Sequence, residues 1–358
     1  MSVDAGFWRG RRVLITGHTG FKGAWLTLWL QQLGAEVTGF ALAPPTAPSL
    51  FELARLAEHC ETLSGDIADP RAVSDALRTA RPEVVIHLAA QSLVRRSYED
   101  PAGTYRMNVM GTVNVLDAVR RHGGETRVLI SVTSDKCYAN DGAGRPFREG
   151  DPLGGRDPYS SSKACAELVT SAFRRSFFDD PAGTRVASAR AGNVIGGGDW
   201  GADRLIADLM AAALAGTSVS IRNPSATRPW QHVLNPLSGY LLLAQRLHSA
   251  PDTDAEFNLG PPAGDERPVA EIVESLAGKW PGGIDVRQDT EPQPHEAATL
   301  RLDSTRARER LGWEPIVSLD AALQSIVDWY RAFQAGEDMR TVTQAQIERF
   351  APSPAPAS

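Results

Sequence analysis

Short apolar runs alternate with amphipathic stretches through the first half of the chain. Five of the runs are short and suited to strands in a sheet that is covered on both faces. They lie at residues 12–16, 36–40, 83–88, 127–132 and 185–189. The stretches between them carry apolar residues at helical spacing and predict helices, among them 24–33, 108–121 and 160–178. Strands that alternate with helices form a parallel sheet, so we expect an α/β, doubly wound fold.

A glycine-rich loop joins the first predicted strand to the first predicted helix. It reads Gly17-His18-Thr19-Gly20-Phe21-Lys22-Gly23. Glycines at this spacing let the backbone turn tightly and approach a pyrophosphate, whose charge then lies at the helix N-terminus. An ordinary glycine-rich turn is the alternative, but the place of the loop in the first βα unit favours dinucleotide binding. The sequence therefore predicts a Rossmann sheet with all seven loop residues in a cofactor site.

The residue that usually selects between the nicotinamide cofactors is missing. An acid ~20 positions beyond the loop normally binds the adenosine ribose. Here the second strand ends in 40–44 (Phe-Ala-Leu-Ala-Pro), with neither an acid nor an arginine for a 2′-phosphate. These residues alone leave NAD and NADP open. Asp66 and Ile67 follow a short strand and are expected to contact the adenine, although Asp66 could equally be a turn aspartate.

The amino-acid composition of the chain changes after about residue 192, where glycine and proline become frequent. We expect residues 1–192 to form the dinucleotide-binding domain. Residues 193–350 are expected to form mainly a smaller C-terminal, substrate-binding domain, although the segment 233–262 could return to the first. The stretch 351–358 is proline-rich and poor in apolar residues, so we expect it to be disordered.

Composition and charge narrow the class of protein. A chain of 358 residues with 42% apolar and 22% charged residues is globular. Its formal net charge of −6, without a basic run, disfavours nucleic acid as a partner. No apolar stretch approaches the ~20 residues of a membrane helix, and no secretory signal is visible. Cys60, Cys137 and Cys165 lack the spacing of zinc ligands, so we expect reduced thiols, no metal and a cytoplasmic location.

Two short segments carry the proton-transfer groups. The segment 133–136 (Thr-Ser-Asp-Lys) follows an apolar run, so Asp135 and Lys136 stand at the end of a predicted strand. Tyr159 and Lys163 are four residues apart, on one face of a predicted helix. Because a nearby ammonium lowers the pKa of a phenol, Tyr159 is expected to act as a base towards an alcohol. A surface Asp-Lys pair is the alternative for 135 and 136, but a strand end beside a cofactor loop favours chemistry.

Together with the glycine loop, this Tyr-x-x-x-Lys segment resembles the extended, nucleotide-sugar-modifying branch of the short-chain dehydrogenase/reductase family. Two further matching strings are 88–91 (Leu-Ala-Ala-Gln) and 108–112 (Asn-Val-Met-Gly-Thr). The resemblance implies that Tyr159 deprotonates the sugar hydroxyl at carbon 4 while hydride leaves to the nicotinamide. It implies that Lys163 lowers the pKa of the tyrosine and binds the nicotinamide ribose. The other contacts it implies are Ser134 in catalysis, Leu88, Ala89, Ala90 and Asn108 at the cofactor, and Ser92 at the substrate.

Asp135 and Lys136 distinguish members of this branch. Related 4-epimerases typically lack an acid followed by a base here, whereas 4,6-dehydratases use the acid to protonate the departing hydroxyl at carbon 6. Their base removes the proton at carbon 5, which oxidation at carbon 4 has made acidic. Hydride then returns to carbon 6, so the cofactor is not consumed. Lysine at 136 and serine at 134 resemble the CDP-glucose 4,6-dehydratases, whereas those acting on dTDP-glucose carry glutamate and threonine.

The resemblance to this subgroup covers nearly the whole chain. Its strings lie at 17–23, 133–138, 190–200, 228–233 and 294–297, while 141–146 departs from the pattern, so a loop over the sugar is expected to differ. It implies a lyase that uses NAD to convert CDP-glucose to CDP-4-keto-6-deoxyglucose for deoxysugar or surface-polysaccharide synthesis. It also implies a homodimer through helices 108–121 and 160–178, although packing in the core explains the amphipathic pattern of these helices equally well. The substrate contacts it implies are Asn193, Arg204, Arg228 and His295; the fork of an arginine suits a diphosphate.

Two other functions stay open at this point. One is another enzyme on the same fold, such as a different nucleotide-sugar dehydratase, a 4-epimerase or a reductase. Asp135 and Lys136 weigh against the last two. The other is a non-catalytic protein that senses a dinucleotide, which has no need of Tyr159 and Lys163.

Overall fold

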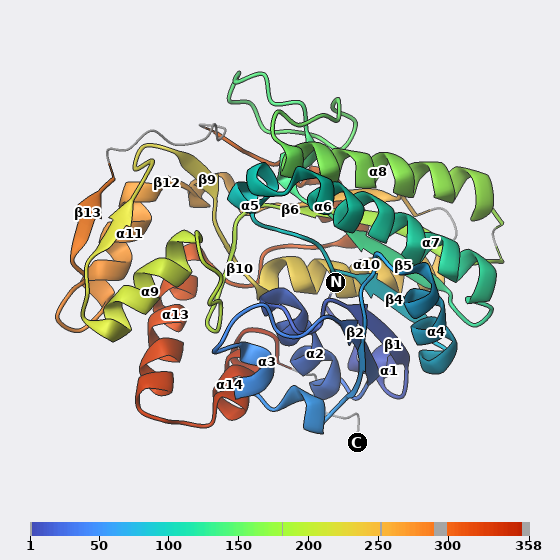
Figure 1. The fold of residues 1–358 in the computed structure, drawn as a ribbon, viewed down its shortest axis with the longest axis horizontal. Coiled ribbons are helices and arrows are strands. Elements are labelled where there is room, and N and C mark those ends of the chain that lie inside the picture. The colour runs from blue at the N-terminus through green and yellow to red at the C-terminus, as the bar shows by residue number, and fades with distance from the viewer. Residues whose placement is uncertain (1, 181, 251–252, 290–298, 353–358) are drawn as a thin grey trace.

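A seven-stranded parallel sheet lies at the centre of the molecule (Figure 1). The structure, a computed structural model, describes residues 2–180, 182–250, 253–289 and 299–352. The strands of the sheet are β1 (Arg12–Thr16), β2 (Glu36–Ala41), β3 (Glu61–Ser64), β4 (Val84–His87), β5 (Val128–Val132), β6 (Arg185–Ala191) and β11 (Glu256–Leu259). They lie in the order β11-β6-β5-β4-β1-β2-β3.

Helices cover both faces of this sheet. Because alternate residues of a strand point to opposite faces, each strand contributes side chains to the apolar core on either side. Val13 and Ile15 of β1 belong to one apolar core, and Leu14 belongs to the other. The helices on the Leu14 side are α4 (Pro70–Ala80), α7 (Gly111–His122) and α8 (Pro158–Phe177). Those on the other side are α2 (Phe21–Gln32) and α10 (Leu234–Ser249). The predicted doubly wound α/β fold is thus confirmed.

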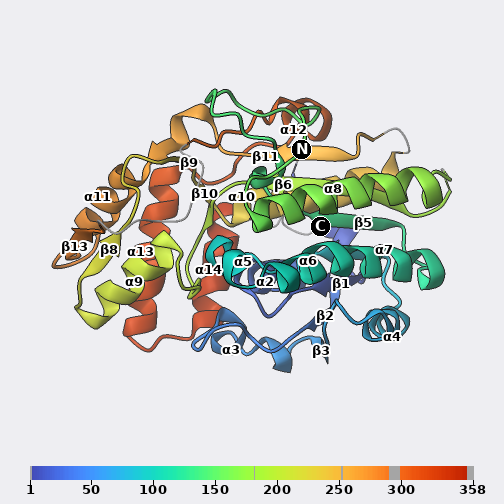
Figure 2. The same ribbon diagram turned by 45° about the horizontal axis from the view of Figure 1, so that its top comes forward.

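Much of the second half of the chain forms a smaller lobe, seen on the left of Figures 1 and 2. Its helices are α9 (Leu205–Ala215), α11 (Val269–Lys279) and α13 (Leu319–Gln334). Its short strands are β7 (Val194–Ile195), β8 (Val219–Ile221), β9 (Thr227–Pro229), β10 (Gln231–His232), β12 (Glu266–Pro268) and β13 (Val286–Gln288). They form three two-stranded sheets, β7 with β10, β9 with β12 and β8 with β13.

The remaining elements are short helices and turns, apart from the last helix. They are α1 (Ala5–Trp8), α3 (Leu50–Leu53), α5 (Val94–Glu99), α6 (Pro101–Tyr105), α12 (Thr305–Leu311), α14 (Met339–Phe350), the 3₁₀ turns η1 (Leu56–Glu58), η3 (Asp135–Cys137) and η4 (Ala263–Asp265), and the π-helical turn η2 (Arg106–Met110). No helix among the described ranges is long and apolar enough to cross a membrane.

The chain passes between the sheet and the smaller lobe more than once. Within the segment 233–262, α10 packs against β5 and β6, and β11 pairs with β6 as an edge strand. Near the end of the chain, α14 packs on α2, where Arg340 Nη2 donates to Gln31 Oε1 at 3.0 Å. Of the stretch 351–358 that we expected to be disordered, only the first two residues lie within the described part.

The predicted strands agree with the observed ones to within two residues, but two helices start differently. The helix expected from Ala24 begins at Phe21, because the last part of the glycine loop already forms its first turn. The helix expected from Asn108 is entered through the π-helical turn η2. Both differences lie where the backbone must fit a neighbouring loop rather than follow an apolar pattern.

Candidate active site

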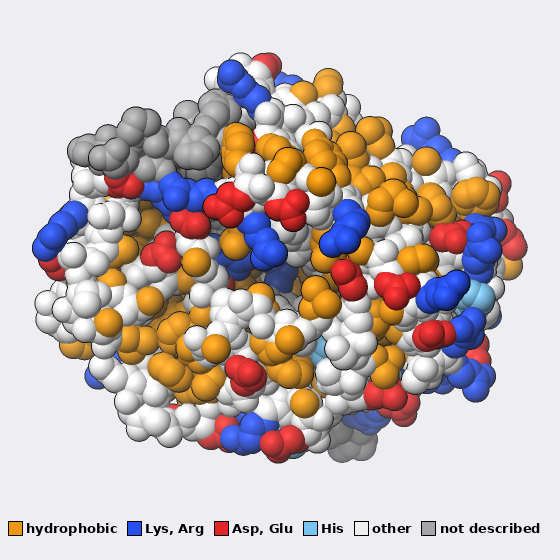
Figure 3. Space-filling view, viewed as in Figure 1, with side chains coloured by type: hydrophobic (Ala, Val, Ile, Leu, Met, Phe, Trp, Pro, Cys, Tyr) orange, Lys and Arg blue, Asp and Glu red, His pale blue; other side chains and the backbone are white. Residues whose placement is uncertain are grey.

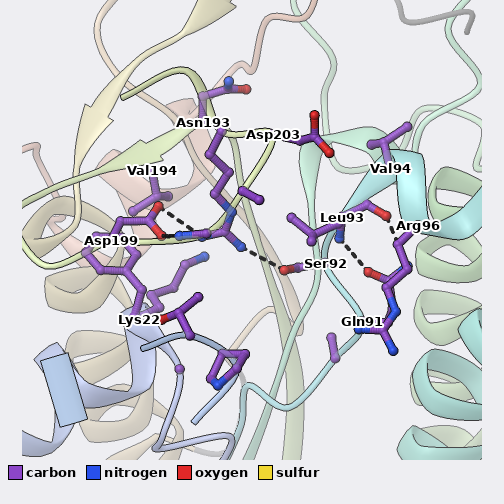
Figure 4. A pocket seen from close by; sticks show the side chains of 18 of the residues that line it. Lys22, Gln91, Ser92, Leu93, Val94, Arg96, Asn193, Val194, Asp199 and Asp203 are labelled. Atoms are coloured by element: carbon purple, nitrogen blue, oxygen red, sulfur yellow. Dashed lines mark hydrogen bonds and ion pairs between the residues drawn. The ribbon is translucent and has the colours of Figure 1, made fainter. Parts of the chain in front are cut away.

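The site lies where the strand order of the sheet reverses. β1 pairs with β2 on one side and with β4 on the other, so the loops that follow β1 and β4 lead away from each other. Such a switch point leaves a crevice at the carboxyl ends of parallel strands. A cavity of about 1030 Å³ opens there, and both loops line it (Figure 4).

Most of the site residues predicted from the sequence line this cavity. They are Gly17, Thr19, Gly20, Phe21, Lys22, Gly23, Asp66, Ile67, Leu88, Ala89, Ala90, Ser92, Ser134, Asp135, Lys136, Tyr159, Lys163, Asn193, Arg204 and Arg228. His18 and Asn108 do not line it, and His295 lies outside the described residues. Among the described ranges, no group of three or more His, Cys, Asp or Glu residues could hold a metal ion.

The side chain of His18 packs beneath the glycine loop instead of entering the cavity. Its ring lies so close to Gly39 that a Cβ there would be 2.1 Å from it, and it meets the Phe51 ring edge-on. Nε2 lies 3.3 Å from Thr62 Oγ1, and burial lowers the pKa of His18 to about 4. A neutral imidazole therefore fills the space between the loop and β2.

Asn108 is also set back from the cavity, and it fastens two elements together. Its Nδ2 donates to the Gln91 carbonyl and to Ser162 Oγ, both at 2.9 Å. Its Oδ1 accepts from the Gln91 amide at 2.8 Å. The side chain thus ties the loop after β4 to α8, which places it behind the predicted cofactor contacts rather than among them.

The glycine loop has the shape that a dinucleotide requires. Gly17 has φ of +80°, and a Cβ there would lie 2.8 Å from the backbone of Ala89. A Cβ at Gly23 would lie 2.2 Å from the Gly17 carbonyl oxygen, so neither position has room for a side chain. Because Gly20 caps α2 without a side chain, the first amides of that helix can bind an anion. These features fit the pyrophosphate of a nicotinamide dinucleotide.

Changing Gly17 to alanine should therefore abolish cofactor binding. The added Cβ meets both a left-handed backbone and the Ala89 backbone, and the loop has to shift. In a thermal melt, NAD at 100 times its Kd stabilises a binding protein by about 2.7 kcal/mol. We expect the variant to lose most of that gain, whereas Gly124→Ala, whose Cβ would lie in open space, should keep it. A full NAD response in the Gly17 variant would refute this role of the loop.

The adenosine end of the cavity contains the residues that follow β2 and β3. Leu42 and Ala43 line it without offering an acid, as the sequence indicates. Asp66 and Ile67 also line it. Asp66 Oδ1 accepts from the Ala68 amide at 2.8 Å, so this aspartate holds a turn and faces the cavity at once.

The predicted proton-transfer groups meet at the carboxyl end of β5. η3 follows that strand and places Asp135 in a buried position, while the first turns of α8 bring in Tyr159 and Lys163. Ser134 Oγ donates to Asp135 Oδ1 at 2.9 Å. Asp135 Oδ2 is buried without a hydrogen-bond partner among the described residues. A buried, unpartnered carboxyl oxygen is costly, so the arrangement favours a protonated acid or a bound donor.

The protonation states of these groups follow mainly from their burial. Burial raises the pKa of Asp135, against the opposing pull of Lys136 and of the hydrogen bond from Ser134. The shift favours the neutral acid, which is the form that can give a proton to a leaving hydroxyl. The base expected beside it, Lys136, is half-buried and lines the same cavity.

Tyr159 differs from the sequence-based expectation. Burial raises its pKa to about 12, although a hydrogen bond with Ser134 and the charge of Arg204 oppose the shift. The Lys163 ammonium, expected to lower it, donates instead to the Val132 carbonyl at 3.4 Å. Burial lowers the pKa of Lys163 to about 8. In the protein alone, desolvation of the phenol therefore outweighs the effect of the nearby ammonium.

Positively charged side chains gather along the cavity. Lys22, Lys163, Arg204 and Arg228 all line it, and burial together with Lys163 and Arg204 lowers the pKa of Lys22 to about 7. Arg228 is buried and lies near enough to Asp135 to act on its charge. Such a concentration of cations in a partly closed space suits a ligand with several negative charges, such as a diphosphate.

Arg204 connects the smaller lobe to the loop after β4. Its Nη1 donates to both carboxylate oxygens of Asp199, at 3.1 and 3.0 Å, and its Nη2 donates to Ser92 Oγ at 2.7 Å. Figure 4 shows Asp199 and Ser92 on opposite sides of this guanidinium. Two predicted substrate contacts thus touch each other. Asp199 was not among the predicted site residues, although it belongs to the matching string 190–200.

Comparisons with known proteins agree with this geometry. A family model described as GDP-mannose 4,6 dehydratase matches residues 14–326. The CDP-glucose 4,6-dehydratase of Salmonella typhimurium is 48% identical over 353 residues, covering 97% of this chain and 98% of that protein. A UDP-glucose 4-epimerase of Thermus thermophilus, solved with NAD, has a TM-score of 0.77 at 25% identity, covering 89% of this chain and 99% of its own. A dTDP-glucose 4,6-dehydratase of Bacillus anthracis shares the fold, with a TM-score of 0.75 at 22% identity, covering 92% of this chain and 100% of its own.

Proposed function

We propose, because the chain belongs to the GDP-mannose 4,6 dehydratase family, that it is a 4,6-dehydratase that converts CDP-glucose to CDP-4-keto-6-deoxyglucose. The observation that carries this function is the meeting of Asp135 and Lys136 with Tyr159 in one cavity. An epimerase or a reductase has no use for the first two groups. The 48% identity to a CDP-glucose enzyme supports the choice of the nucleotide sugar.

The first step removes the proton of the hydroxyl at carbon 4, and Tyr159 is positioned to accept it. NAD, when bound, supplies the acceptor for the hydride from carbon 4 and later its donor. Because the pKa of Tyr159 is about 12 in the protein alone, the phenol needs further positive charge before it can act as a base. Arg204 already acts in that direction, and Lys163 lies one turn along α8. Ser134 steadies the phenol by its hydrogen bond.

The second step is the loss of water across carbons 5 and 6. Lys136 takes the proton from carbon 5, and the electron pair of that C–H bond forms the C5–C6 double bond. Asp135 gives its proton to the hydroxyl on carbon 6, so the C–O bond breaks and water leaves. Burial raises the pKa of Asp135, which favours the protonated form that this step requires. NAD would supply the hydride that returns to carbon 6, and Lys136 gives its proton back to carbon 5. The proton that Tyr159 took from carbon 4 balances the one that Asp135 gave to the departing water.

The cofactor and the compartment are supported by separate observations. The glycine loop fits a pyrophosphate, and the UDP-glucose 4-epimerase of the same fold was solved with NAD, which supports NAD as the cofactor. Cys60, Cys137 and Cys165 are all free thiols. Unpaired cysteines are typical of the reducing cytoplasm.

Incubation with CDP-glucose and NAD tests the function directly. Mass spectrometry should show a product lighter by one water, with no net consumption of NAD. The same assay with dTDP-, GDP- and UDP-glucose should give slower turnover, because the relative that is 48% identical is a CDP-glucose 4,6-dehydratase. A product of unchanged mass would indicate an epimerase, and consumption of reduced cofactor would indicate a reductase. Either result would overturn the proposal.

A homodimer is the assembly that the surface supports. Large apolar side chains are exposed on α5, α6, η2 and α8, and Figure 3 shows apolar groups gathered over this region. The side chains are Tyr98, Tyr105, Met110, Leu168 and Phe177. Contiguous apolar patches on a protein surface mark interaction sites. Since α7 and α8 lie side by side there, two copies can pair them into a bundle of helices.

Leu168→Glu should convert this dimer to a monomer. The leucine side chain is 58% exposed on α8, and a charge there would be buried without a partner in the interface. Light scattering should give the mass of two chains for the wild type and of one chain for the variant. Ile316→Glu, at an exposed apolar residue outside the patch, should remain dimeric. A monomeric wild type would refute the proposed assembly.

A further inference from the structure

A buried ion pair lies behind the loop that carries the candidate acid and base. Glu167 on α8 and Arg190 on β6 are each 2% exposed, and Glu167 Oε2 lies 2.7 Å from Arg190 Nη2. Burying two charges costs several kcal/mol per ion, and apolar residues of similar size are often at least as stabilising. Neither residue lines the cavity or takes part in the proposed reaction. Stability alone is therefore a weak reason for the pair.

The two charged groups hold the two ends of the active-site loop, residues 133–138. At one end, Thr133 Oγ1 donates to Glu167 Oε1. At the other end, Arg190 Nη1 donates to the phenol oxygen of Tyr138 at 2.7 Å. The contacts Thr133–Glu167–Arg190–Tyr138 thus close a ring with the backbone of the active-site loop. Asp135 and Lys136 lie on the chain segment that this ring encloses.

The ring is itself fixed to the sheet and to a second loop. Glu167 Oε2 accepts from Ser188 Oγ at 2.7 Å, and Arg190 Nη1 donates to the Glu149 carbonyl at 3.0 Å. Tyr138 donates its hydroxyl to Asn258 Oδ1 of β11 at 2.7 Å, and its ring lies beneath the guanidinium. The active-site loop therefore has little freedom to move relative to β5, β6 and α8.

We propose that Glu167 and Arg190 are positioning residues for the elimination step, a role that rests on the proposed function. By holding both ends of the active-site loop, the ion pair keeps the Asp135 carboxyl and the Lys136 amine at a fixed place above the substrate. The backbone of α8 holds Tyr159 and Lys163 in place directly, and the charge of Glu167 acts on Lys163 by raising its pKa. Loss of the ion pair therefore damages elimination more than oxidation.

Glu167→Gln tests this role, because glutamine keeps the size of the side chain and an acceptor for Thr133 but removes the charge. We expect kcat for water loss to fall by roughly 10- to 100-fold, since a misplacement of about 1 Å can cost 10²-fold. The KM for CDP-glucose should change by less than about threefold, because the cavity lining is intact. Glu256→Gln is the matched control. It breaks the half-buried ion pair with Arg174 between α8 and β11, outside the ring, and should keep wild-type kcat.

Isotope effects separate positioning from general damage. With CDP-glucose deuterated at carbon 5, the isotope effect on kcat of Glu167→Gln should be at least that of the wild type. With deuterium at carbon 4, the effect should be no larger than in the wild type, because elimination then limits the rate more strongly than oxidation does. A larger effect at carbon 4, or a kcat no lower than that of Glu256→Gln, would overturn the proposal.

A second variant covers the case in which Glu167→Gln does not fold. Thr133→Val has nearly the same shape and removes only the hydrogen bond from the active-site loop to Glu167. It should show the same pattern of isotope effects with a smaller loss of kcat, and wild-type kinetics would count against the ring. Failure of the proposed function looks different, since the wild type itself would then release no water from CDP-glucose.

Discussion

Asp135→Asn should lower kcat for water loss by about 10²–10⁴-fold, with little change in the KM for CDP-glucose. The amide has the same shape as the acid, so it can still accept from Ser134, but it has no proton to give to the hydroxyl on carbon 6. Burial raises the pKa of the native carboxyl, so the acid form that is lost is the one that the site favours. Product formation followed by mass spectrometry measures the change.

The control for this prediction is Asp75→Asn, at an exposed carboxyl on α4. It should keep wild-type kcat, because Asp75 does not line the cavity. Thermal melts should show that both variants fold. If Asp135→Asn retained more than about a tenth of the wild-type kcat, a proton donor other than Asp135 would have to serve carbon 6.

Tyr159→Phe should lower kcat by a similar factor, about 10²–10⁴-fold, but at the oxidation step. Phenylalanine fills the same buried space and lacks the hydroxyl that bonds to Ser134 and takes the proton from carbon 4. Deuterium at carbon 4 should therefore give a large isotope effect on the residual rate, whereas Asp135→Asn should show little effect there. A variant that kept the wild-type rate would show that a group other than Tyr159 takes the proton from carbon 4.

Much of the fold could be predicted because strands that are buried on both faces consist largely of apolar residues. Residues 84–86 are all apolar because helices cover both faces of β4, and the glycine loop marks the first βα turn. Both signals are local, so a single sequence carries them. Most of the site residues that line the cavity could also be predicted, because they follow parallel strands whose carboxyl ends meet at one edge of the sheet.

The direction of individual side chains could not be predicted in the same way. His18 was expected at the cofactor, but its ring is held by Gly39 and Phe51, which the sequence does not place beside it. The pKa of Tyr159 depends on burial by the whole fold, whereas the sequence shows only a lysine four residues away. The bond between Arg204 and Ser92 joins residues 112 positions apart.

The ion pair of Glu167 and Arg190 was equally hidden. Glutamate and arginine are almost never fully buried unless they are paired, so a single sequence favours exposed positions for both. Only the assembled sheet shows that α8 crosses β6 where the two charges can meet. Arg190 belongs to the matching string 190–200, but that string does not indicate that Glu167 is its partner.

Cys137 gives the active-site loop a built-in chemical reporter. Its thiol is fully buried, and burial raises its pKa well above the usual value, so it is protected from reagents that attack the thiolate. Cys60 and Cys165 are only partly covered. A maleimide dye is expected to label Cys60 and Cys165 of the native protein first. Labelling of Cys137, the third cysteine, would therefore report an opening of residues 133–138. The labelling rate then measures how often the catalytic loop comes apart, with no substrate present.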